Sequence, residues 1–131
     1  MTFTDKEREY LDGQFLGRLA TIGPDGGPRN VPVGFRLNAG LGTIDIAGRA
    51  LGASQKFRNI QRNPLVSFVV DDLVSVDPWT PRFMEIRGAA EALSSGGEAF
   101  GSYYSPELIR ITPRRIVAFG IDGQDRVARN V

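Results

Sequence analysis

The chain has 131 residues, which is the size of one domain, and its net charge of +1 gives no global field that would attract nucleic acid. It contains neither cysteine nor histidine, which excludes disulfides, thiolate nucleophiles, His-activated serines and metal or haem sites built on these residues. If the protein is an enzyme, its chemistry must come from other side chains or from a cofactor.

Two further features bear on location and charge. No apolar run approaches the ~18 residues that a membrane-spanning helix needs. The first residues are charged and lack the apolar core of a signal peptide, so we expect a cytoplasmic protein with no membrane or nucleic-acid partner. Of the 16 basic residues, only Lys6 and Lys56 are lysines.

The N-terminal part predicts a short helix followed by a hairpin. Thr4 and Glu7 have the spacing of a capping box, and Gly13 is suited to end the helix. Strands are predicted over Phe15–Ile22 and Asn30–Leu37, on either side of a Gly-rich turn. Pro32 lacks the N–H that a central strand needs, so the second strand should lie at an edge or bulge.

The middle of the chain predicts a strand, a loop and a helix. Alternation favours a strand over Leu41–Ala47, and glycines mark a loop over Gly48–Gly52. Ser54–Asn63 is predicted as a helix, with Phe57 and Ile60 on its buried face.

The C-terminal half predicts further strands. Leu65–Val70 is rich in β-formers, and Asp71-Asp72 is expected to end it. A long strand over Phe83–Leu93 places Glu85 and Arg87 on one face, where they pair or meet solvent. A flexible connection then leads through Leu108–Ile111 to a last strand over Arg115–Ile121, and the tail after Gly123 is expected to fray.

This pattern indicates one mainly β domain over residues 1–131. About six short strands joined by tight turns favour an antiparallel β-barrel with an N-terminal and a mid-chain helix, rather than βαβ units. Neither a GxGxxG loop nor a P-loop is present, so the two common nucleotide-binding devices are missing.

The segment from Gly48 to Arg62 is the best candidate for binding chemistry. Its glycines let a ligand approach the backbone, and the helix that follows offers unpaired N–H groups and a positive dipole end. Ser54, Lys56, Arg49 and Arg58 add hydroxyl and cationic donors, which together suit a phosphate. A solvated loop with a basic helix face is the alternative.

Aromatic residues in two loops are weaker candidates. Trp79 lies in a proline-flanked loop, where it could stack on a ring or pack at a barrel end or subunit interface. Tyr103 and Tyr104 could gate a pocket or cover the end of the barrel.

The order of several motifs resembles the pyridoxamine 5′-phosphate oxidase-like superfamily, and within it the small branch that uses coenzyme F420. The resemblance extends from about Phe15 to Asp122. The motifs that carry it are the hairpin segment Gly17–Gly26, the strand Asn30–Phe35, the helix Ser54–Pro64, the long-strand segment Glu85–Glu91, and Ile109–Pro113 before the last strand.

The resemblance implies a split β-barrel that forms a homodimer, with the cofactor in a groove between subunits. It implies that Lys56 and Ser54 bind the phosphate and that Asn59 lies near the cofactor of its own or of the partner subunit. From their charge, we further expect Arg58 and Arg62 to attract the anionic glutamate tail of F420. The implied lining of the ring comprises Asn30, Val31, Pro32 and Val33 on one side and Ile46, Ala47, Gly48 and Arg49 on the other, with Trp79 as a further candidate. The family often has a basic residue where this chain has Ser54-Gln55.

The function implied is an F420H2-dependent reductase that passes hydride to a small electron-poor acceptor, such as a conjugated carbonyl, quinone or tetrapyrrole. An FMN-dependent oxidoreductase of the same fold is the first alternative, and a non-catalytic F420-binding or storage protein is the second. No dedicated catalytic side chain and no metal site are identified, because hydride can pass directly from cofactor to substrate.

Overall fold

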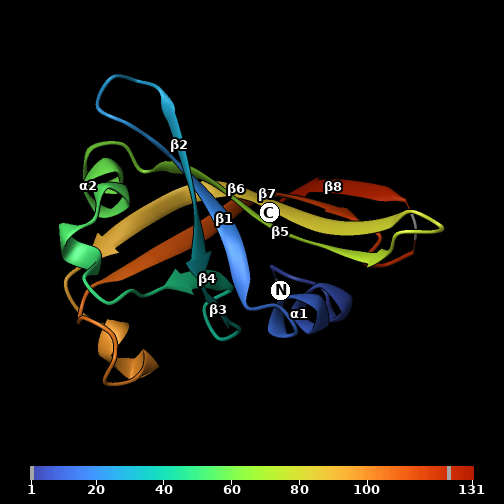
Figure 1. Cartoon of the computed structure of the whole chain (residues 1–131), viewed down its shortest axis with the longest axis horizontal. Helices are drawn as coiled ribbons and strands as arrows, with labels where there is room; N and C mark the ends of the chain where they lie inside the picture. Colours follow the sequence, from blue (N-terminus) through green and yellow to red (C-terminus); the bar gives the residue numbers. More distant parts are fainter. Residues whose placement is uncertain (1, 124) are drawn as a thin grey trace.

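The computed structural model describes residues 2–123 and 125–131, which form one curved antiparallel sheet flanked by two α-helices (Figure 1). The strand order is β2-β1-β5-β6-β7-β4-β3, and β8 also pairs with β7. The elements are α1 (Asp5–Asp12), β1 (Leu16–Ile22), β2 (Pro28–Gly34), β3 (Arg36–Asn38), β4 (Thr43–Ile46), η1 (Leu51–Ala53), α2 (Gln55–Arg62), β5 (Leu65–Ser75), β6 (Thr80–Leu93), η2 (Gly97–Phe100), β7 (Leu108–Phe119) and β8 (Arg126–Asn130).

The connection between β2 and β3 explains why the sheet curls. These strands stand at opposite ends of the strand order, yet only Phe35 separates them in the sequence. The sheet must therefore bend round until its two ends meet. Within the described residues no ladder joins β2 to β3, so the barrel is split there. The predicted mainly β split barrel is confirmed.

The core lies inside the curl of the sheet. Alternating residues of the long strands point inward, and Leu19, Phe68 and Ile86 are fully buried. From α2, Phe57 and Ile60 join this core, as predicted from their spacing. Among the described residues, no helix is long and apolar enough to cross a membrane.

Several local predictions are confirmed. Thr4 caps α1 through the predicted capping box: its hydroxyl accepts from the Glu7 N–H at 3.2 Å, and the Glu7 carboxylate accepts from the Thr4 N–H at 3.0 Å. Pro32 lies on β2 at the end of the strand order, opposite Arg18. The Arg87 guanidinium pairs with the Glu85 carboxylate at 2.9 Å.

Two predictions about strand ends are wrong. Asp71 and Asp72 do not end β5, which continues to Ser75 because the Asp72 carboxylate accepts two bonds, of 3.0 and 2.6 Å, from Arg82 across the ladder. The tail does not fray. Its β8 pairs with β7, and Arg129 donates to the Glu7 carboxylate of α1 at 2.7 and 2.6 Å.

The number of strands also differs from the prediction. The single strand expected over Asn30–Leu37 is interrupted at Phe35 to give β2 and β3, and β8 was not expected at all. In contrast, the lead through Leu108–Ile111 and the last strand form one continuous β7. The sheet therefore has eight strands.

Candidate functional site

The entry to α2 is shaped by Ser54, its N-cap. The Ser54 hydroxyl donates to the Leu51 carbonyl oxygen at 2.6 Å and accepts from the Phe57 N–H at 3.4 Å. These bonds fix the turn between η1 and α2, as expected of an N-cap serine. A ligand could accept a bond from this hydroxyl only if the bond to Leu51 were broken.

The first turn of α2 offers three unsatisfied donors. Among the described residues, no acceptor meets the backbone N–H of Gln55 or of Lys56, and the Lys56 ammonium has no ion-pair partner. Lys56 is half-buried, and its desolvation lowers its pKa below the usual value. A bound phosphate would satisfy all three donors and offset the desolvation of the cation, so this part of the chain fits a phosphorylated cofactor.

The two neighbouring arginines, Arg58 and Arg49, differ in how many of their N–H donors are free to bind a ligand. Arg58 donates to the Ala53 carbonyl oxygen at 2.7 Å and to the Gln55 side chain at 3.0 Å, so it holds α2 to η1. Arg49 is exposed, and its guanidinium lies 5.9 Å from the centre of the Tyr103 ring. Arg49 therefore keeps more of its donors open to a ligand than Arg58 does.

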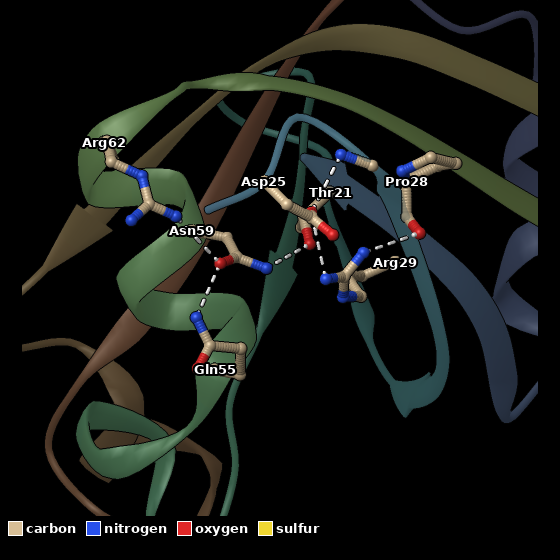
Figure 2. A network of polar contacts seen from close by, with 8 residues as sticks. Thr21, Asp25, Pro28, Arg29, Gln55, Asn59 and Arg62 are labelled. Carbon is tan, nitrogen blue, oxygen red and sulfur yellow. Dashed lines mark hydrogen bonds and ion pairs between the residues drawn. The ribbon is translucent and has the colours of Figure 1, made fainter. Parts of the chain in front are cut away.

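Asn59 lies inside the protein and binds three of its neighbours (Figure 2). Its side-chain N–H donates to the Thr21 hydroxyl at 3.0 Å, and its side-chain oxygen accepts from Gln55 at 2.7 Å and Arg62 at 3.4 Å. The residue is 0% exposed. In this conformation Asn59 holds α2 against β1 and has no exposed surface that could contact the expected cofactor. Arg62 contributes to the same hydrogen-bonded cluster by donating to Asn59.

The Thr21–Asn59 bond brings two predicted parts of the site together. Thr21 stands opposite Arg29 in the β1–β2 ladder, so α2 lies beside the start of β2. In that hairpin Asp25 accepts from Arg29 at 3.0 Å, which fixes the turn (Figure 2). The contacts thus link α2 through β1 to the start of β2.

The strands expected to line a cofactor ring are only partly open. Asn30, Val31 and Pro32 are exposed on β2, which as an edge strand has backbone groups free on one side. Val33, Ile46 and Ala47 are buried on the core side. The half-buried Gly48 and exposed Arg49 continue from β4 toward η1.

Trp79 lies far from this region. It is 69% exposed at the connection between β5 and β6, at the opposite end of the sheet from α2 (Figure 1). The strand β5 begins directly after α2 and has 11 residues, so at about 3.3 Å per residue it spans roughly 33 Å. A hollow of about 440 Å³ lies here, and its walls include Val74, Pro78, Trp79, Pro81 and Phe119.

The sequence did not reveal the contact between two loops at the site. The Ser105 hydroxyl donates to the Gly48 carbonyl oxygen at 2.9 Å and accepts from the Leu51 N–H at 3.1 Å. The Glu107 carboxylate accepts from the Gly52 N–H at 3.3 Å. These residues are more than fifty positions apart in the chain, and no local pattern predicts such pairing.

The buried carboxylates are structural. Burial favours a raised pKa at Asp45, but bonds from Arg110, Asn38 and Thr43 hold the pKa of Asp45 below its usual value. Within the described residues, no cluster of acidic side chains could hold a metal ion. The site therefore suits binding and orientation of a cofactor rather than general acid chemistry by Asp45.

Comparisons with known proteins identify the family of this chain. Residues 3–123 match the family described as pyridoxamine 5′-phosphate oxidase. A curated protein of Streptomyces rimosus, 5a,11a-dehydrotetracycline/5a,11a-dehydrooxytetracycline reductase, is 50% identical over 123 residues, which are 94% of this chain and 87% of that protein.

Solved structures show the same fold. A structure named F420 reductase is 25% identical with a TM-score of 0.65, and the match covers 83% of this chain and 94% of that one. The protein Rv2991 of Mycobacterium tuberculosis is 24% identical with a TM-score of 0.70, and the match covers 88% and 84% of the two chains. The second likeness shows the fold alone.

Proposed function

Because this chain belongs to the pyridoxamine 5′-phosphate oxidase family, we propose that it is an F420H2-dependent reductase of a fused-ring conjugated ketone. It is an oxidoreductase of this fold, since a relative with 50% identity over nearly the whole chain is a reductase. The identity of the cofactor and the class of the acceptor are what we propose beyond this.

The feature that carries the cofactor proposal is Lys56. A half-buried ammonium without an ion-pair partner among the described residues stands beside two unbonded N–H groups at the start of α2. These groups hold the phosphate, and the exposed edge of β2 from Asn30 to Pro32 lies along the ring. When bound, the reduced deazaflavin supplies the hydride.

The acceptor class comes from the S. rimosus relative. Its named substrates carry a double bond between ring carbons 5a and 11a of a tetracycline. Reduction of such a bond adds one hydride and one proton across it. We extend this class to the present chain: a fused-ring compound with an electron-poor carbon–carbon double bond.

A second candidate cofactor is FMN, which also carries a phosphate for the donors of α2 and a flat ring. The structure named F420 reductase favours the deazaflavin. Titration with both compounds separates them: we expect F420 fluorescence to change on binding and FMN fluorescence to stay constant. Tight F420 binding without reduction of any fused-ring acceptor would instead indicate a carrier protein.

Substitution of the lysine tests the phosphate site directly. Lys56→Ala should weaken cofactor binding by at least ~1.5 kcal/mol, more than tenfold, because it removes a charged hydrogen bond. The control is Lys6→Ala, which removes the chain's other lysine from the exposed face of α1 and should leave affinity unchanged. Equal affinity for Lys56→Ala and the wild type, measured by fluorescence titration, would overturn the assignment.

A further inference from the structure

Three aromatic side chains gather in the connection between β6 and β7, which lies toward the same end of the sheet as α2 (Figure 1). Phe100 and Tyr104 meet edge to face with ring centres 5.6 Å apart, and Tyr104 meets Tyr103 in the same way at 5.3 Å. Tyr104 is half-buried, whereas Tyr103 is 66% exposed. Tyr104 therefore packs between Phe100 and Tyr103, and it supports the exposed ring of Tyr103.

This aromatic segment is fastened to the loop that precedes α2. Both the N–H and the hydroxyl of Ser105 donate to the Gly48 carbonyl oxygen at 2.9 Å. The same hydroxyl accepts from the Leu51 N–H. The backbone of Gly97 packs closely against that of Ser105: a Cβ added at Gly97 would lie 2.5 Å from the Ser105 carbonyl oxygen, so only glycine fits there. The position of Tyr103 is thus tied to the segment proposed to line the cofactor groove.

The space beside the cluster suits one edge of a flat ligand. A hollow of about 170 Å³ separates the aromatic cluster from the end of β4, and its walls include Phe35, Arg36, Ala47, Phe100 and Tyr104. Whole ligand pockets generally measure about 300–1,000 Å³, so this hollow accommodates part of a larger molecule. Arg49, over the Tyr103 ring, adds positive charge for oxygen substituents.

Resting on the proposed function, we propose that Tyr103 is a specificity-determining residue that stacks on the fused rings of the acceptor. Ser105 is the positioning residue that holds the aromatic segment against Gly48. A flat, oxygen-rich ring system matches both the exposed ring of Tyr103 and the charge of Arg49.

Equilibrium binding of tetracycline, a stable fused-ring probe, tests the proposal by calorimetry on the full chain. Stacking on Tyr103 predicts that Tyr103→Ala weakens tetracycline binding about fivefold, while Tyr103→Phe stays within about twofold. Ser102→Ala, an exposed change in the same segment, is the matched control and should bind as the wild type does.

Ser105 is tested by removing and restoring its hydroxyl. Ser105→Ala should weaken tetracycline binding, though less than Tyr103→Ala, because it removes the hydroxyl bonds to Gly48 and Leu51 and leaves only the backbone N–H bond to Gly48. Ser105→Thr, which keeps a hydroxyl, should recover most of the affinity. A lowered melting temperature with unchanged affinity in Ser105→Ala would overturn its positioning role.

The outcomes separate this proposal from the proposed function. Unchanged tetracycline affinity in Tyr103→Ala, no tetracycline binding by the wild type, or an equal loss of F420 affinity would each overturn the role of Tyr103. Failure of the wild type to bind F420 or FMN would overturn the reductase proposal, and Tyr103-dependent tetracycline binding would then still support the stacking role.

Discussion

At the scale of single residues, Asn59 joins α2 to β1 through a buried polar cluster. Its loss would leave the Thr21 hydroxyl buried without its donor, which costs about 1–3 kcal/mol. We therefore expect Asn59→Ala to lower the free energy of unfolding by that amount in the absence of any cofactor. Urea unfolding followed by circular dichroism measures it.

The control for Asn59 lies on the same helix. Gln61 is exposed, so Gln61→Ala should change the free energy of unfolding by no more than about 0.5 kcal/mol. If Asn59→Ala kept full stability but lost cofactor affinity, Asn59 would contact the ligand after all.

Lys56 and Asn59 show what could be predicted of the site. The donors at the start of α2 follow from local sequence, because an N-cap serine and a lysine in the first turn define them. Asn59 was expected near the cofactor because it lies in the helix motif that resembles that of the family. Its actual partner, Thr21, lies in another element, and that pairing depends on how the sheet folds back.

At the scale of elements, the ion pair between Glu7 and Arg129 fastens β8 to α1. Glu7 is 3% exposed, and desolvation alone favours a raised pKa, but the bonds from Arg129 and Thr4 hold the pKa of Glu7 below its usual value. Since the folded pKa is lowered, this pair stabilises the fold above the unfolded pKa of about 4.3. This contribution to the free energy of unfolding is lost as the pH falls through the pKa of Glu7 in the folded protein.

Arg129→Met tests this link. At pH 7 it leaves the Glu7 carboxylate buried without its cation, so the free energy of unfolding should fall by about 3 kcal/mol. The difference from the wild type should shrink between pH 5 and pH 3, as Glu7 takes up a proton in the variant. Urea unfolding across this pH range measures it, with the exposed Arg126→Met on the same strand as control. A difference that stays constant with pH would contradict the role of Glu7.

The same strand shows why some elements escaped prediction. The end of the chain, from Arg126 to Asn130, is polar and has only Val127 and Ala128 as apolar residues. Its stability comes from the β7 ladder and from Arg129, which are contacts distant in sequence. Likewise, the sequence predicted that Asp72 ends a strand, but the strand continues because Asp72 pairs with Arg82 across the hairpin.

At the scale of the whole molecule, the parts assigned to one cofactor lie at opposite ends of the sheet. Lys56 is at the start of α2, and Trp79 is beyond the far end of β5 (Figure 1). Large apolar side chains are also exposed, including Phe15 at 88% and Val76 at 71%. Exposed apolar surface of this kind is typical of an interface. We therefore predict a homodimer in which Trp79 of one copy completes the site at Lys56 of the other.

Mixing two defective variants tests this shared-site proposal. In a homodimer with sites made by both copies, Lys56→Ala and Trp79→Ala each damage both sites. A mixed dimer of the two variants has one site with both residues intact and one with neither. Random reassembly makes about half of the dimers mixed, so about a quarter of all sites should regain wild-type F420 affinity.

The measurement is a fluorescence titration of F420 after the two variants are mixed, unfolded and refolded together. Light scattering first establishes whether the wild type has twice the chain mass of 14.3 kDa. Each variant refolded alone is the control and should show no high-affinity sites. Because β5 separates Lys56 from Trp79 by roughly 33 Å within one copy, a site made by two copies is the arrangement in which both residues contact one ring and its phosphate. A dimer in which mixing restores no sites, while each single variant binds weakly, would overturn the shared-site proposal.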